Sequence, residues 1–101
     1  MKYKIVITKA ADRDFIKDFL WYAKENSDLA KRFRESIKKE IKFLSDAPFA
    51  CALISKEARQ VISHKFPYRI IFIIEDNNVV IIAILHVKRS PSIWKKRITN
   101  H

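Results

Sequence analysis

The sequence predicts an α+β fold in which one strand and a pair of helices precede a run of strands. β-branched residues are dense at residues 3–8, apolar residues recur at helical spacing over residues 9–46, and β-branched residues dominate again over residues 68–87. Helices and strands that are segregated along a chain favour two helices packed on one face of a mainly antiparallel sheet. A length of 101 residues suits one domain, so we expect residues 1–101 to form a single core.

The first strand gives way to the first helix near Lys9. Ile5, Val6 and Ile7 stand in succession, as in a short strand that is covered on at least one face. From about Lys9 the aromatic residues recur at helical spacing, and polar residues occupy the other side. We expect this helix to run from Lys9 to about Glu25.

A second helix completes an antiparallel helical hairpin. Residues 25–28 include one residue that tolerates the left-handed conformation at a helix end and two that can cap the next helix. An apolar stripe then runs at steps of four, four, four and three residues, formed by Leu29, Phe33, Ile37, Ile41 and Leu44. Pro48 marks the end of this helix.

The second half of the chain predicts a three- to four-stranded, mainly antiparallel sheet. Residues 47–58 are irregular, and we interpret them as a loop with at most one short strand or turn. Three strands follow, at residues 59–63, 68–75 and 79–87. A hairpin turn at residues 76–78 joins the last two strands. The chain contains no glycine, so a turn position with positive φ must be filled by Asn or Asp, for which Asn77 and Asn78 are the candidates.

The charge and composition of the chain narrow the classes of function. Lysine and arginine number 21 against 11 acidic residues, a formal net charge of +10. Such a body attracts an acidic partner, whether nucleic acid, an acidic protein segment or an anionic membrane surface. The absence of glycine excludes the glycine-rich phosphate loops of P-loop and dinucleotide-binding enzymes. His64, His86 and His101 have no recognised metal-ligand spacing, so we expect neither a metal site nor a cofactor.

Cysteine usage and hydropathy predict the compartment. The apolar stretches are far shorter than the ~20 residues that span a bilayer, and the first of them is too short for a signal peptide. Cys51 has no partner for a disulfide within the chain, and its apolar neighbours favour a buried small residue over a nucleophile. We expect a cytoplasmic protein without a membrane partner.

One stretch that mixes basic and aromatic residues runs from Arg59 to Arg69. Lys65, Phe66 and Tyr68 lie between these arginines. This pattern suits RNA, because cations meet phosphates while rings stack on bases. The alternative is that both rings belong to the core, which we favour, and that Arg69 pairs with a carboxylate, which we leave open.

A second basic group follows the last strand. We expect alternation to place His86 and Lys88, with Arg69 of the neighbouring strand, on related faces. In a ribonuclease site, His86 could move the proton of the 2′-hydroxyl while Arg69 and Arg89 stabilise charge on the phosphorane. No carboxylate or isolated tyrosine completes such a set. A strand-end histidine bonded to the backbone is an equal alternative.

The last fifteen residues carry several cations and one tryptophan but no acid. They form either a binding surface, with Trp94 as its aromatic anchor, or a solvated tail. The basic face of the second helix could likewise hold DNA or keep the protein soluble. The candidate residues for binding a target or nucleic acid are Arg59, Lys65, Lys88, Trp94, Lys95, Lys96 and Arg97.

Three segments taken together resemble the C-terminal half of RelE/ParE toxins. They are the strand Tyr-Arg-Ile-Ile-Phe at residues 68–72, the turn and strand at residues 76–82, and the strand end Ile-Leu-His-Val-Lys-Arg at residues 84–89. The order of the predicted elements agrees with that family as well. The resemblance extends over most of the chain and is weak at residues 47–58. It implies a toxin of a type II toxin–antitoxin system.

The two branches of this superfamily act differently, and the sequence is closer to the ParE branch. RelE-type toxins cut messenger RNA in the ribosome, whereas ParE-type toxins poison DNA gyrase. The long helical hairpin, with Trp-Tyr-Ala at residues 21–23, and the Leu85-His86 ending resemble ParE. Arg69 and Arg89 match catalytic arginines of RelE but also occur in ParE relatives. RelE carries a tail tyrosine near the place of Trp94 or Lys95 here, and neither residue replaces a phenol.

The resemblance implies a cognate antitoxin that wraps the toxin and forms a hetero-oligomer with it. A net charge of +10 favours an acidic wrapping segment. Inhibition of gyrase is therefore the first expectation, and ribosome-dependent cleavage of messenger RNA is the second. A basic α+β module that binds nucleic acid without toxicity is the alternative from a different class.

Overall fold

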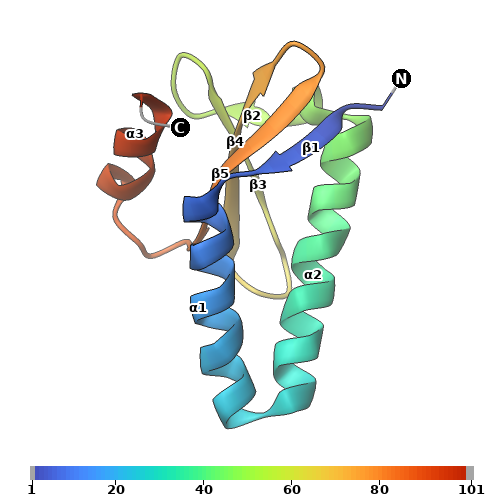
Figure 1. The fold of residues 1–101 in the computed structure, drawn as a ribbon, viewed down its shortest axis with the longest axis vertical. Helices are drawn as coiled ribbons and strands as arrows, with labels where there is room; N and C mark the ends of the chain where they lie inside the picture. The colour runs from blue at the N-terminus through green and yellow to red at the C-terminus, as the bar shows by residue number, and fades with distance from the viewer. Residues whose placement is uncertain (1, 100–101) are drawn as a thin grey trace.

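The computed structural model describes residues 2–99 and confirms the predicted α+β architecture (Figure 1). In chain order the elements are β1 Lys4–Ile7, α1 Lys9–Glu25, α2 Ser27–Asp46, a 3-10 turn Pro48–Ala50, β2 Ala52–Leu53, β3 Ala58–Ile62, β4 Tyr68–Glu75, β5 Asn78–His86 and α3 Pro91–Thr99. The strands form one sheet in the order β1-β5-β4-β3-β2. β1 runs parallel to β5, and all other neighbours are antiparallel.

Both faces of the sheet are covered, so the protein has two apolar layers. The α1–α2 hairpin packs on one face around Phe33, which is fully buried. The ring of Phe33 stacks on Phe15 at 5.4 Å and lies 4.7 Å from the ring of Tyr68. On the other face α3 covers the second layer, in which Trp94 is the large aromatic side chain. The prediction that the two helices pack on one face of the sheet is thus confirmed, whereas α3 on the other face was not predicted.

A single residue, Asn26, joins the two long helices. Its backbone N–H donates to the carbonyl of Tyr22 and ends α1, while its side-chain oxygen accepts from the N–H groups of Asp28 and Leu29 and caps α2. The backbone of Asn26 is extended, with φ −166°. The helix therefore ends without the left-handed residue that the sequence predicts, because one extended residue suffices to reverse the chain.

The turn between β4 and β5 differs from its prediction in one residue. Glu75 pairs with Asn78, which leaves a two-residue turn of Asp76 and Asn77. Among the described non-glycine residues, positive φ occurs at Asp76 (56°) and not at Asn77 or Asn78. Asp and Asn both tolerate this conformation, so the residue type was anticipated and the position was wrong.

The irregular segment before β3 holds more structure than a loop. The 3-10 turn closes the C-terminal end of α2, and the two residues of β2 then pair with Arg59 and Gln60 of β3. No helix within residues 2–99 is long and apolar enough to cross a bilayer.

Candidate functional site

The two residues predicted to form the core of a ribonuclease site point to opposite faces of the sheet. His86 lies directly opposite Tyr68, and Arg69 lies opposite Leu85. Neighbouring residues of a strand project to opposite faces, and paired residues share a face. His86 therefore lies on the α1–α2 face with Tyr68, and Arg69 lies on the α3 face with Leu85. The prediction of related faces was wrong.

The guanidinium of Arg69 holds neighbouring segments together. Nη1 donates to Oε1 of Gln60 on β3 at 3.0 Å, and Nη2 donates to the carbonyl of Val87 at 3.2 Å. Arg69 is half-buried and pairs with no carboxylate among the bonds of the described residues. It therefore ties β3 and the end of β5 to β4.

The imidazole of His86 is bonded to the backbone, as the structural alternative predicted. Its Nδ1 accepts the backbone N–H of Lys88 at 3.1 Å, which requires the neutral tautomer with the proton on Nε2. Its ring lies edge-on to that of Tyr68, at a centroid distance of 5.4 Å. The phenol of Tyr68 donates to Oδ2 of Asp18 at 2.8 Å. Burial and this hydrogen bond raise the pKa of Tyr68 above its ordinary value, so the phenol stays protonated and cannot act as a base.

Arg89 lies beside α1. It lines a shallow hollow of about 120 Å³ together with Arg13 and Lys17 of α1 and the backbone of β5. The same hollow contains Asp14 and Asp18, and both are engaged in bonds to the body of the protein. The two arginines and the histidine predicted to act together, Arg69, Arg89 and His86, are thus not gathered at one point.

The C-terminal segment is a helix that packs on the sheet. Only 6% of Trp94 is exposed, so its indole belongs to the second apolar layer and is not an exposed anchor. Nζ of Lys95 lies 5.9 Å from the Trp94 ring centroid. The signal for this helix was present in the sequence, since Pro91 suits a first helical position and Ile93, Trp94 and Arg97 recur at helical spacing.

Arg97 forms the shortest ion pair among the described residues. Its guanidinium donates twice to Asp14, at 2.6 and 3.1 Å, and once to the carbonyl of Ile82 at 3.1 Å. Asp14 also accepts the backbone N–H of Ile84 at 3.0 Å. These bonds occupy the part of the β5 edge that extends past the end of β1. Arg97 is therefore a structural residue, and sequence reasoning missed its partner Asp14.

The remaining predicted binding residues fall into two groups. Arg59 is structural, because its Nη1 donates to the carbonyl of Cys51 at 2.7 Å and its guanidinium lies 5.1 Å from the Phe49 ring centroid. Lys88, Lys95, Lys96 and Lys65 are exposed. Lys65 lines a cleft of about 290 Å³ between α2 and the β3–β4 connection, and the hydroxyls of Ser36 and Ser63 meet within that cleft at 2.6 Å.

A second concave surface is mostly apolar and lies between α1 and α2. It has a volume of about 230 Å³ and is lined by Ile7, Asp12, Phe15, Arg34, Ile37, Lys38, Ile41 and Ile84. Ile7 and the neighbouring Ile16 of α1 are each 45% exposed. This α1–α2 groove thus combines exposed aliphatic side chains with two cations.

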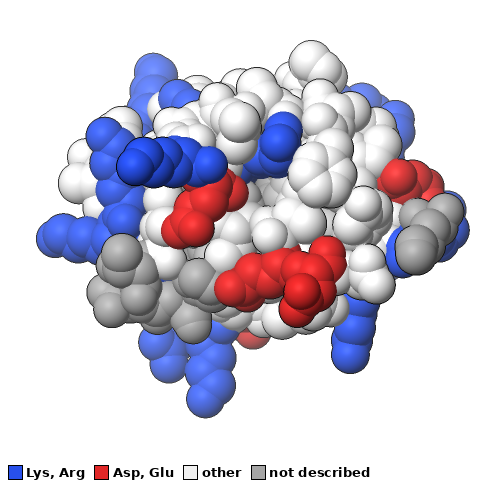
Figure 2. All heavy atoms as spheres, turned by 90° about the horizontal axis from the view of Figure 1, so that it is seen from above, with Lys and Arg blue, Asp and Glu red and all other residues white. Residues whose placement is uncertain are grey.

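Neither metal nor thiol chemistry has a site in the described residues. No group of three His, Cys, Asp or Glu side chains within residues 2–99 is arranged to hold a metal ion, and His101 lies outside the described residues. Cys51 is buried, and burial raises the pKa of its thiol, which disfavours the reactive thiolate. Seen from above, Lys and Arg side chains project at several places around the edge of the molecule, and the acids form smaller, separate groups (Figure 2).

Comparison with solved structures gives the fold a precedent. The chromosomal ParDE toxin–antitoxin system from P. aeruginosa includes a chain with a TM-score of 0.76 and 16% identity, covering 86% of this chain and 98% of that one. A double arginine mutant of E. coli RelE in the free state gives 0.65 and 15%, covering 98% and 97%. The intact E. coli RelBE complex gives 0.65 and 18%, covering 86% and 99%. These identities establish a shared fold alone.

The sequence itself carries the family assignment. A search of curated proteins finds no significant match. A family model for the ParE toxin of the type II toxin–antitoxin system matches residues 5–91, which include β1 except its first residue, the helical hairpin and every later strand. The chain therefore belongs to the ParE toxin family of type II toxin–antitoxin systems.

Proposed function

We propose that this toxin acts on DNA gyrase and does not cut messenger RNA. The observation that carries the proposal is the separation of Arg69 and His86 onto opposite faces of the sheet. Cleavage of RNA at the 2′-hydroxyl requires a proton acceptor and a charge-stabilising cation around one phosphate. The guanidinium of Arg69 is moreover already bonded to Gln60 and to the carbonyl of Val87.

Several of the other candidate groups are occupied within the fold. Tyr68 is buried and bonded to Asp18, and Trp94 is buried under α3. The guanidinium groups of Arg69 and Arg97 are engaged in structural bonds. These placements support the non-enzymatic ParE-like action over ribosome-dependent cleavage.

The test compares two reactions of the purified chain. We expect it to inhibit supercoiling by gyrase and to leave ribosome-bound messenger RNA intact. The Arg69→Gln variant should keep most of the gyrase inhibition, because the Arg69 side chain bonds only to Gln60 and Val87 of the protein itself. The Arg89→Ala variant tests transcript cleavage alone. Cut transcripts that disappear in either variant would overturn the proposal.

The same proposal includes a cognate antitoxin that neutralises the toxin by binding the α1–α2 groove. Exposed Ile7 and Ile16 offer apolar contacts, and Arg34 and Lys38 at the groove suit an acidic amphipathic segment. Ile16→Asp should weaken neutralisation by the cognate antitoxin while the toxin stays folded, and co-purification from cells measures this. The protein would act as a single domain in the cytoplasm, where gyrase and the antitoxin are found. The free cysteine Cys51 suits that reducing compartment.

A further inference from the structure

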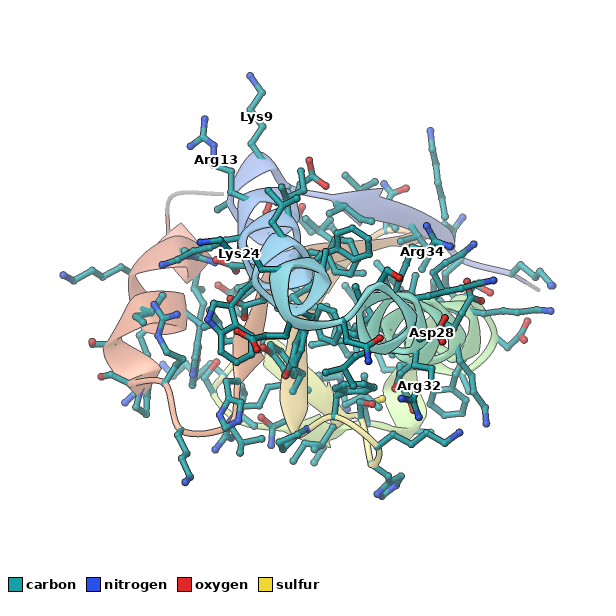
Figure 3. All side chains as sticks on the ribbon, turned by 90° about the horizontal axis from the view of Figure 1, so that it is seen from below. Lys9, Arg13, Lys24, Asp28, Arg32 and Arg34 are labelled. Atoms are coloured by element: carbon teal, nitrogen blue, oxygen red, sulfur yellow. The ribbon has the colours of Figure 1, made fainter. Side chains whose placement is uncertain are left out.

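Helix α1 carries a row of cations on one side. Lys9, Arg13 and Lys17 are spaced by four residues, and Lys24 follows seven residues later, so all four share one side of the helix. All four are exposed. Lys9 and Arg13 project outward from α1 in the view from below (Figure 3). These four residues are called the α1 cationic stripe.

The fold does not use the α1 cationic stripe. Within residues 2–99, no side chain forms a hydrogen bond or ion pair with any of its four members. The acids of α1 face elsewhere: Asp14 pairs with Arg97, Asp18 accepts from Tyr68, and Asp12 lines the α1–α2 groove. Glu25 follows Lys24 directly and therefore lies about 100° away around the helix.

Helix α2 has more cations, but acids are interleaved with them. Glu35 lies on its exposed face and pairs with Arg34 at 3.6 Å. Asp46 pairs with Lys2 at 3.7 Å. The α2 surface is thus mixed in sign, whereas the α1 cationic stripe has one sign throughout.

The position of Lys9 argues that the stripe serves a purpose other than stability. Lys9 is the first residue of α1, where the helix dipole disfavours a cation. No acid is bonded to Lys9 among the described residues to offset this cost. A charged residue that disfavours its own helix, and forms no bond that compensates, is expected at a functional surface.

Arg89 extends the stripe across to the end of β5. It shares the shallow hollow with Arg13 and Lys17, and the two acids of that hollow are already satisfied by Arg97 and Tyr68. The hollow therefore presents three cations that form no side-chain bond within the described residues, beside the carboxylates of Asp14 and Asp18.

We propose that the α1 cationic stripe, together with Arg89, binds the sugar–phosphate backbone of duplex DNA. The inference rests on the proposed action on gyrase, because the DNA in question is the segment that gyrase holds. The stripe from Lys9 to Lys24 is about 22 Å long. A DNA strand presents one phosphate per about 3.4 Å of axis, so each cation can meet a phosphate.

The chemistry of the stripe favours phosphate over an acidic protein surface. Lysine is depleted from the centres of protein interfaces, which contain aromatic and apolar residues. Three of the four members are lysines, and the exposed apolar side chains of Ile16 and Leu20 lie beside them on the same side of α1. Contacts to the DNA backbone are made by Lys and Arg themselves, so they do not depend on these apolar side chains.

The experiment measures binding of the full chain to a short random-sequence duplex across about 50–200 mM salt. The stripe variant combines Lys9→Gln, Arg13→Gln, Lys17→Gln and Lys24→Gln. The matched control combines Lys31→Gln, Arg32→Gln, Lys39→Gln and Lys42→Gln on α2, which removes the same numbers of lysines and arginines. Circular dichroism establishes that both variants fold.

We expect the plot of log affinity against log salt to be less steep by about 3–4 units in the stripe variant, since each phosphate contact contributes about 0.9. The control should keep most of the wild-type slope. Equal losses in both variants, an unchanged stripe variant or no binding by the wild type would each overturn the inference.

A gyrase assay separates this inference from the proposed function. If the wild type does not inhibit gyrase, the proposed function fails whatever the duplex shows. If it inhibits gyrase and the stripe variant inhibits equally well, the DNA contact fails while the gyrase target stands. Tight binding to DNA-free gyrase that is lost in the stripe variant would assign the stripe to an acidic protein surface and overturn the DNA contact.

Discussion

The pair formed by Asp14 and Arg97 should control whether α3 stays on the sheet. Arg97→Ala removes two hydrogen bonds to Asp14 and one to the carbonyl of Ile82. The Asp14 side chain is only 12% exposed and would keep its charge with the backbone N–H of Ile84 as its remaining partner. Breaking a buried pair on one side costs about 3–5 kcal/mol, and the partial exposure here lowers our expectation to about 2–4 kcal/mol.

Urea unfolding of the wild type, Arg97→Ala, Asp14→Ala and the double variant measures this term. We expect the double variant to lose less free energy of unfolding than the two single losses added together, because it leaves no unpaired charge. Lys31→Ala is the control, since Lys31 is exposed and its loss should change stability by less than about 0.5 kcal/mol. Additive losses, or a single-variant loss as small as the control, would refute the reasoning.

Two further predictions concern the two faces of the sheet. Trp94→Ala should cost about 3–5 kcal/mol because it empties the second apolar layer, and the remaining fluorescence should come from the exposed Trp21; a variant as stable as the wild type would show that α3 does not hold its place. For Tyr68, the raised pKa means that the folded phenol keeps its proton while the unfolded one loses it near pH 10. Its contribution to stability is therefore full below that pH and is lost as pH rises further. Tyr68→Phe should flatten this alkaline loss, and identical pH profiles of unfolding for the two proteins would contradict the assignment.

Elements with a strong local pattern could be predicted from the sequence. The predicted bounds of α1 and β4 agree with the structure. Aromatic residues at helical spacing and a run of β-branched residues each determine the conformation of their own segment. Membership of the RelE/ParE superfamily, closer to ParE, is likewise confirmed. The two-residue strand β2 was allowed for only as a short strand or turn within residues 47–58, since a segment so short is defined by its partner on β3.

Features that depend on distant residues could not be predicted in the same way. The nine residues of α3 are stabilised by Trp94 in the second layer and by Arg97 bonding to Asp14, a residue 83 positions earlier. The faces of Arg69 and His86 depend on the register of β4 against β5, and a shift of one residue exchanges the two faces. A local sequence pattern carries no information about that register.

The structure also changes which cations are candidates for binding a target. The arginines that drew attention in the sequence, Arg59, Arg69 and Arg97, each donate several hydrogen bonds to carbonyl, amide or carboxylate oxygens. A planar guanidinium with five donors suits such ties, whereas the flexible ammonium of lysine suits solvent and phosphate. Charges consumed by the fold cannot also recognise a target. The functional part of the net charge is therefore what the fold leaves over, and on one side of α1 that remainder is entirely positive.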